Sequence, residues 1–151
     1  MPAPELSLHP VDPGDRDRLV GLARAFHAED GHPLDAGGEA ALAALCSGEP
    51  FGRGWLARTG GEVVGYAVLS LGFSVEFGGR DGFVDDLYLV PAARGRGLGR
   101  ALLERLVDEA RALGVRTLHL EVEPLNARAE ALYARHGFAP SPRRLMSRRL
   151  R

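Results

Sequence analysis

The sequence predicts an α/β (α+β) protein with a mixed, mostly antiparallel central sheet flanked by helices. Two observations support this. Two apolar segments, Gly54–Arg58 and Glu62–Leu69, flank Thr59–Gly61, whose paired glycines are typical of a β-hairpin turn. Further on, Phe83–Leu113 passes from a strand through a glycine-rich turn into an amphipathic helix, and an alternating segment follows at Val115–Pro124. A strand–helix–strand succession forms a right-handed crossover, so these two strands are expected to be parallel.

The N-terminal half predicts one short strand, two helices and then three antiparallel strands. Leu6–Pro10 is the first strand, and Asp15–Glu29 has the apolar spacing of a helix that ends near Gly31. A second helix is expected over Ala36–Cys46. The three strands are expected at Gly54–Arg58, at Glu62–Leu69 and from Phe83 onward, with an alternating and then turn-like stretch at 73–80.

The C-terminal half predicts two helices and two strands. The helix Leu98–Leu113 ends at Gly114, where a glycine commonly closes a helix. The strand at 115–124 follows it. Asn126 stands at the N-cap of a short helix that Gly137 closes. Arginines alternate with apolar residues over Arg143–Leu150, which indicates a last edge strand.

Length and composition indicate one domain, residues 1–151. The chain has a net charge of −1, with acidic and basic residues interspersed, so neither a nucleic-acid partner nor a membrane surface is expected. Lysine is absent, which excludes Schiff-base chemistry on a lysine. Cys46 is the single cysteine, so no internal disulfide can form, and a small buried side chain is expected there. The first residues lack the pattern of a signal peptide, and we expect a cytoplasmic protein.

The turn Arg94–Arg100 has the composition of a loop that binds an anion. N–H groups at a helix N-terminus lack intrahelical partners, and glycines let that backbone approach a phosphate. A P-loop needs a lysine and a hydroxyl residue after its last glycine, whereas Arg100 and Ala101 follow here. The dinucleotide fingerprint G-x-G-x-x-G needs a glycine where Arg100 stands. Neither of these phosphate loops fits.

Two motifs together resemble those of the GNAT superfamily of N-acetyltransferases. Arg94, Gly97 and Gly99 match R-x-x-G-x-G, the acetyl-CoA pyrophosphate loop of that family. A second motif, N-x-x-A-x-x-x-Y-x-x-x-G-F, is matched at Asn126, Ala129, Tyr133, Gly137 and Phe138. The resemblance covers Phe83–Phe138. It implies the GNAT fold, in which two parallel strands splay apart and acetyl-CoA enters between them.

The resemblance also implies which residues hold acetyl-CoA, the co-substrate. The backbone of Leu87, Tyr88 and Leu89 would pair with its pantetheine arm like an added strand. Asn126 and Tyr133 would contact it from the second motif. The turn residues expected to hold the pyrophosphate are Arg94, Gly95, Arg96, Gly97, Leu98, Gly99 and Arg100. The sequence does not decide which arginine reaches the adenosine phosphates: Arg96, Arg100, Arg128 or Arg135.

Direct attack by an amine on the thioester requires a base, because an alkylammonium with a pKa of about 10.4 is protonated at neutrality. Asp85, on the strand expected to carry the acetyl group, is the first candidate, and Glu123 acting through a water is the second. Related enzymes often have Glu at the position of Asp85. Because Asp is shorter, the sequence does not decide whether Asp85 abstracts the proton directly. Asp86 is expected on the opposite face from Asp85. Tyr133 is the candidate acid toward the leaving thiolate.

The resemblance places the acceptor between the first two helices and the strands before the turn. Acidic and aromatic residues there favour a cationic amine, whether a polyamine, an aminoglycoside or a lysine-like group on a small molecule or peptide. The expected acceptor-binding residues are Glu29, Asp30, His32, Phe73, Glu76 and Asp85, with His27, Asp35 and Phe77 nearby. No further ligand motif accompanies these polar residues, and no metal is expected.

One alternative shares both motifs: a non-catalytic acyl-CoA-binding module that regulates a partner. The presence of Tyr133 beside several carboxylates favours the enzyme. The identity of the amine, the length of the acyl group and the oligomeric state, a homodimer included, stay open.

Overall fold

The computed structural model describes residues 5–151, which form two compact units. The first unit extends to Glu121 and contains a sheet and three α-helices; the second spans Val122–Arg151 and contains α4 (Ala127–Arg135). Within the described residues, no helix combines the length and the hydropathy that a membrane span requires.

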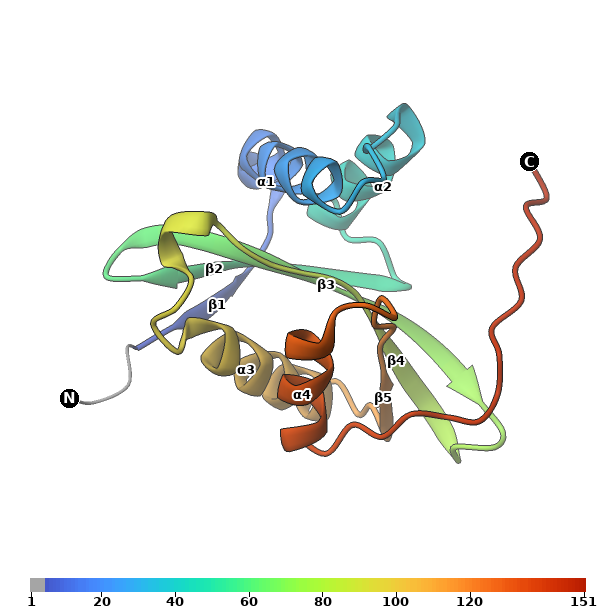
Figure 1. Cartoon of the computed structure of the whole chain (residues 1–151). Coiled ribbons are helices and arrows are strands. Elements are labelled where there is room, and N and C mark those ends of the chain that lie inside the picture. The colour runs from blue at the N-terminus through green and yellow to red at the C-terminus, as the bar shows by residue number, and fades with distance from the viewer. Residues whose placement is uncertain (1–4) are drawn as a thin grey trace. The chain divides into compact units, whose positions relative to one another are not determined.

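A five-stranded sheet in the order β1-β2-β3-β4-β5 forms the centre of the first unit (Figure 1). The pairs from β1 to β4 are antiparallel and β5 pairs with β4 in parallel. This confirms the mixed, mostly antiparallel sheet. The strands are β1 (Ser7–Pro10), β2 (Gly52–Thr59), β3 (Glu62–Ser74), β4 (Gly79–Leu89) and β5 (Thr117–His119).

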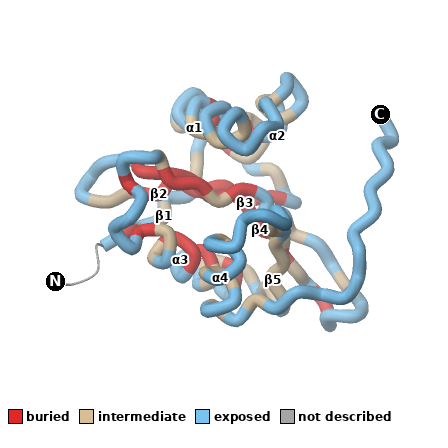
Figure 2. Tube along the Cα trace, in the orientation of Figure 1, coloured by how far each residue is buried: buried red, intermediate tan, exposed pale blue. Residues whose placement is uncertain are grey.

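Helices cover both faces of this sheet. The pair α1 (Arg16–Glu29) and α2 (Ala36–Cys46) lies on one face, and α3 (Leu98–Ala112) lies on the other (Figure 1). Each face therefore has its own apolar core, one with α1 and α2 and one with α3. Figure 2 shows buried residues concentrated in the central strands and along α3. Two short 3₁₀ turns, η1 (Pro13–Asp15) and η2 (Pro91–Ala93), precede α1 and α3.

Local signals set several element boundaries as predicted. Gly60 and Gly61, both at positive φ, form the turn between β2 and β3. Gly114, at φ +80°, follows the end of α3. The Asp35 carboxylate caps α2 by accepting a hydrogen bond from the Gly38 N–H. In the second unit the Asn126 side-chain oxygen caps α4, accepting from the Ala129 N–H at 3.1 Å.

Two predicted strands differ in the structure. The strand predicted over 115–124 is limited to Thr117–His119, because β4 and β5 pair at only three positions. The segment Arg143–Leu150 forms no strand. No strand of the described chain pairs with it, and an isolated extended segment gains no ladder hydrogen bonds. Its apolar side chains are exposed: Leu145, Met146 and Leu150.

Candidate functional site

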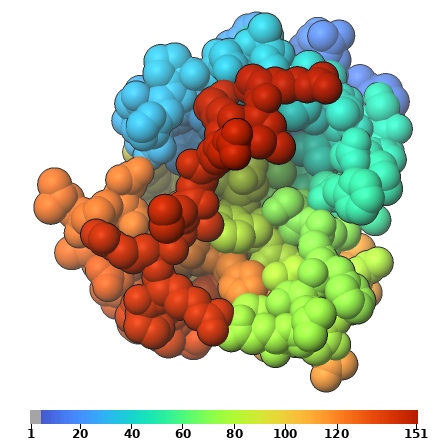
Figure 3. All heavy atoms as spheres, turned by 90° about the vertical axis from the view of Figure 1, so that its right-hand side faces the viewer, coloured from blue at the N-terminus to red at the C-terminus, as the bar shows by residue number. Residues whose placement is uncertain are grey.

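β4 continues beyond its parallel partner. β5 pairs with Asp81, Gly82 and Phe83, and in the described part of the chain no strand lies beside Val84–Leu89 on the edge away from β3. This is the splayed parallel pair that the family resemblance implies. An edge with unpaired N–H and C=O groups can accept another extended segment. In the space-filling view β4 is set back between the α1–α2 pair and the β3–β4 hairpin (Figure 3).

A β-bulge interrupts β4 at Asp85. Val68 of β3 pairs with Asp86 and Leu69 pairs with Val84, so Asp85 is an extra residue without a partner opposite it. A bulge bends the strand and disrupts its ladder locally. The regular alternation of the strand is therefore interrupted here: Val84 packs in the core with α3, whereas Asp86, two residues on, bonds to Tyr66 of the core with α1 and α2.

Asp86 is a buried carboxylate, with 8% of its surface exposed. Its Oδ2 accepts a hydrogen bond from the Tyr66 hydroxyl at 2.7 Å and lies 2.9 Å from Nε2 of His27 on α1. Burial, followed by the charge of Asp86, raises the pKa of Tyr66 far above its ordinary value. The phenol consequently stays protonated and donates. Two donors thus compensate the buried charge.

Asp85 has a raised pKa, although solvent still reaches its side chain. The largest cause is partial removal of the carboxyl group from water, and the second is the charge of Asp86. His27 acts in the opposite direction, and Glu121, just past β5, raises the pKa further. Asp85 is therefore a stronger base than an ordinary surface aspartate.

The glycine-rich turn presents unpaired backbone donors at the start of α3. Gly95 and Gly97 have φ values of +78° and +77°, and no side chain caps the helix at Gly97. Among the described residues, no acceptor pairs with the N–H groups of residues 95–100; the helical bonds begin with Ala101 N–H to the Gly97 carbonyl at 3.3 Å. Such a group of amides at a helix N-terminus suits a phosphate.

The Arg94 side chain packs back against the protein. Its guanidinium contacts both oxygens of the Glu29 carboxylate, at 2.8 and 3.0 Å, and donates to the Leu89 carbonyl at 3.1 Å. It also lies over the ring of Tyr88, 5.6 Å from the centroid. The hydrogen bond from Arg94 lowers the pKa of Glu29. Arg94, expected at the pyrophosphate, and Glu29, expected at the acceptor, thus bind each other and connect α1 to the end of β4.

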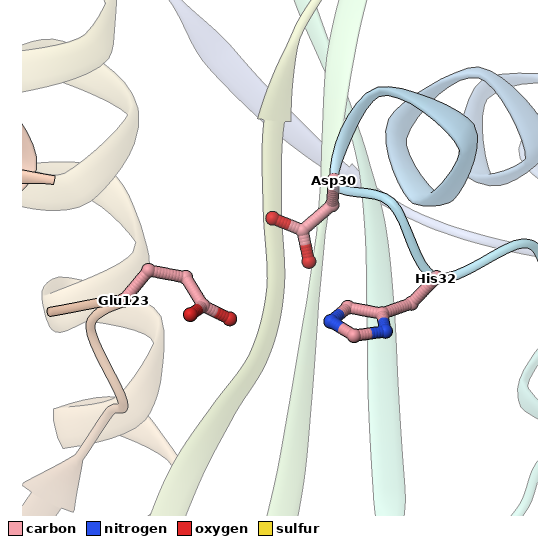
Figure 4. A group of neighbouring side chains, drawn as sticks. All are labelled: Asp30, His32 and Glu123. Atoms are coloured by element: carbon pink, nitrogen blue, oxygen red, sulfur yellow. The ribbon is translucent and has the colours of Figure 1, made fainter. Parts of the chain in front are cut away.

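The other predicted acceptor residues lie in two regions of the first unit. Asp30 and His32 follow the end of α1, where Figure 4 shows their side chains. Phe73 and Glu76 lie on the β3–β4 hairpin, where Phe73 is 82% exposed. In the turn of that hairpin the ring of Phe77 contacts His119 at 4.8 Å between centroids, and His119 lies 3.2 Å from the Asp81 carboxylate.

The remaining predicted site residues belong to the second unit and are described within it. Glu123, the third residue labelled in Figure 4, precedes α4. Tyr133 lies on α4, where its ring packs edge-on against Phe138 with 6.0 Å between centroids. Burial raises the pKa of Tyr133, so its hydroxyl is protonated over a wide pH range.

Residues 19–138 match the model of the acetyltransferase (GNAT) family. The chain belongs to this family. It is 38% identical over 123 residues to the IAA acetyltransferase of Azospirillum brasilense, across 82% of this chain and 71% of that protein.

Solved structures share the fold of this GNAT acetyltransferase. An integron cassette protein from the Cole Harbour salt marsh metagenome aligns with a TM-score of 0.81 and 41% identity, over 95% of this chain and 90% of that one. A predicted acetyltransferase from Clostridium acetobutylicum, solved with acetyl-CoA, aligns with a TM-score of 0.75 and 19% identity, over 95% and 96% of the two chains.

Three residues near Asp85 in this GNAT acetyltransferase were not among the predicted site residues: Asp86, Glu121 and Tyr66. The β-bulge changes the alternation of β4 just before Asp86, and the residues of β4 carry no sequence signature for it. The bond between His27 and Asp86 joins positions 59 residues apart, so no local pattern could reveal it. Glu121 did carry a signal, because its alternation with His119 places both on one face of the strand.

Proposed function

We propose that the protein transfers an acetyl group from acetyl-CoA to a cationic amine by direct attack of the amine nitrogen on the thioester. The observation that supports this most is the continuity of two groups of unpaired backbone donors. The open edge of β4, Val84–Leu89, leads through η2 into the free amides of residues 95–100. An extended chain that ends in a diphosphate would satisfy both groups.

The residues at these two places fit acetyl-CoA as a substrate. The backbone of Leu87–Leu89 would pair with the pantetheine arm, and the amides of residues 95–100 would bind the diphosphate. Arg94 would hold the turn in place through the Leu89 carbonyl and Glu29 rather than bind the phosphates itself. Asn126 keeps its side-chain N–H₂ for the substrate, since the cap of α4 uses only its oxygen.

In the proposed reaction the amine nitrogen forms a bond to the acetyl carbon, the carbon–sulfur bond breaks, and the sulfur leaves as a thiolate. The attacking amine must first lose the proton of its ammonium form, which costs roughly 4.6 kcal/mol at neutral pH for a pKa of about 10.4. Asp85 would accept that proton, and its raised pKa makes it the better acceptor. Glu123, acting through a water, is the alternative base.

Tyr133 would stabilise the leaving sulfur. Its pKa is raised by burial, so the hydroxyl is a hydrogen-bond donor at neutral pH. An ordinary thiol has a lower pKa than an ordinary phenol. Full transfer of the phenol proton to the thiolate therefore costs about 2 kcal/mol of free energy. Hydrogen bonding to the departing thiolate is accordingly the larger part of its proposed role.

A cationic acceptor is supported by the charges around the open edge of β4. The charge of Glu121 is one cause of the raised pKa of Asp85. Aromatic rings that can face a cation are also present: Phe83 of β4 and Phe77 of the turn between β3 and β4 both lie against His119. An ammonium group would relieve the repulsion between the two carboxylates.

The test is release of free thiol from acetyl-CoA with a panel of primary amines. Spermidine, an aminoglycoside and a lysine peptide represent the cationic class; a neutral amino sugar and glutamate serve as uncharged and acidic comparisons. We expect turnover with at least one cationic amine and none with glutamate. Preference for the neutral or acidic amine would contradict the proposed acceptor class. Tight binding of acetyl-CoA without thiol release for any amine would instead favour the regulatory module.

A further inference from the structure

Three side chains from three elements form a hydrogen-bonded group around Asp86, the residue that follows the bulged Asp85. Tyr66 of β3 is fully buried, Asp86 of β4 is 8% exposed, and the side chain of His27 on α1 is 26% exposed. Tyr66 and His27 both bind the same oxygen of Asp86, at 2.7 and 2.9 Å. The group therefore runs from the interior of the first unit to its surface.

The Tyr66 hydroxyl fixes the hydrogen-bonding pattern of this group. Because that phenol stays protonated, it donates to Oδ2 of Asp86. The carboxylate oxygen can only accept, so Nε2 of His27 must donate to it. The other ring nitrogen, Nδ1, takes no part in this bond, so the hydrogen bond to Asp86 fixes the orientation of the imidazole ring.

We propose that His27 and Asp86 are positioning residues that together set the proton affinity of Asp85. Asp86 is adjacent in sequence to the bulged Asp85 and carries a buried negative charge, which favours the protonated form of Asp85. A protonated His27, bonded to Asp86, counteracts that charge. The inference rests on the proposed function in one respect: Asp85 is taken as the base.

The ionisable groups that interact with Asp85 belong to α1, β3, β4 and the segment that follows β5. Asp86 and Glu121 disfavour its ionised form, His27 favours it, and the neutral phenol of Tyr66 adds no charge. His27 and Asp86 therefore act on Asp85 with opposite signs, although they are bonded to each other. Loss of a merely structural contact would not produce opposite effects at the two ends of one bond.

The experiment is a ¹³C NMR titration of the Asp85 carboxyl carbon, assigned by its absence in the Asp85→Asn variant. We compare the wild type with Asp86→Asn, which keeps the side-chain shape, and His27→Gln, which keeps a donor. We expect the midpoint of Asp85 to fall by about one pH unit in Asp86→Asn and to rise by a comparable amount in His27→Gln. Tyr66→Phe, which removes a hydroxyl but no charge, should leave the midpoint within about 0.3 units of the wild type.

Shifts of the same sign in Asp86→Asn and His27→Gln, or no shift in either, would overturn the proposal. The rising, acid-side limb of the pH profile for thiol release should move with the NMR midpoint. If the midpoint moves as expected while thiol release does not depend on Asp85, the electrostatic inference stands and the assignment of Asp85 as base fails. The two failures are thus separate.

Discussion

Two adjacent carboxylates of β4 have different surroundings, and the difference decides which one can act as a base. Asp86 is buried and already accepts hydrogen bonds from Tyr66 and His27. Asp85 occupies the bulge, remains accessible to solvent and accepts no such bond from any residue that the structure describes, while its pKa is raised by desolvation and by Asp86. A catalytic base needs both access to its substrate and a pKa near the pH at which it works.

The Asp85→Asn variant tests this assignment. A base must be deprotonated, so wild-type activity should fall as the pH is lowered through the raised pKa of Asp85. In the variant we expect thiol release about 10²-fold slower and without that acid-side limb. The pH dependence of kcat/KM provides the measurement. An unchanged acid limb would move the role of base to Glu123 or to water.

The same raised pKa makes a prediction about stability. A carboxyl group whose pKa is higher in the folded than in the unfolded state favours folding while it is protonated, and this contribution is lost as the pH rises through the folded-state pKa. The Asp85→Asn variant has no carboxyl group to ionise at this position, so it does not lose this stability as the pH rises. The variant should therefore melt at a higher temperature than the wild type at pH 7, with the difference shrinking toward pH 4. A melting temperature of the variant below that of the wild type at pH 7 would contradict the predicted direction of the effect.

Tyr133→Phe separates chemistry from binding. The substitution keeps the ring that packs on Phe138 and removes only the hydroxyl. We expect kcat to fall about 10²-fold, with the Kd for acetyl-CoA changed by less than about threefold. Stopped-flow thiol release and calorimetric binding of acetyl-CoA would measure the two quantities. Equal turnover in this variant would remove Tyr133 from the reaction.

Among the helices and strands, those with signals in their own residues were predictable. The Gly60–Gly61 hairpin, the Asn126 cap and the glycines at both ends of α3 carry such signals, and the structure agrees with each. Long-range pairing decided the rest. β5 ends at His119 because β4 no longer pairs with it, and the bond of Arg94 to Glu29 joins residues 65 positions apart. No local pattern contains such contacts.

The two glycines that flank α3 offer a matched pair of substitutions. Gly97 at the N-terminus and Gly114 at the C-terminus have φ values of +77° and +80°. Apart from the chain neighbours, an added Cβ would meet no atom of the described residues within 4 Å at either position. Alanine should therefore cost similar stability at both, about 1 kcal/mol. Only Gly97 lies in the turn proposed to bind the diphosphate. We expect Gly97→Ala to weaken acetyl-CoA binding about tenfold and Gly114→Ala to leave it unchanged. Equal losses of affinity in calorimetry would show that backbone strain alone explains the effect.

Across the first unit, the sheet holds β4 firmly while leaving one of its edges open. Val84 and Leu89 pack in the core with α3, Tyr88 packs in the core with α1 and α2, and β3 pairs along the other edge. The open edge is thus a rigid surface rather than a fraying strand. A ligand that pairs there should bind without a large ordering cost and should stabilise the folded state.

Acetyl-CoA should therefore raise the melting temperature and protect particular amides from hydrogen exchange. At a free concentration of 100 times its Kd the stabilisation is about 2.7 kcal/mol, which corresponds to roughly 5–10 °C for a chain of this size. Added protection should concentrate at those amides of residues 84–89 that point away from β3 and at residues 95–100, whose N–H groups have no acceptor among the described residues, while β1 serves as the internal reference. Hydrogen-exchange mass spectrometry with and without acetyl-CoA resolves these segments. Binding that protects other segments instead would mean that the thioester does not lie at the open edge of β4. The assignment of Asp85 as the base and of the acidic residues around it as the acceptor site would then lose its support.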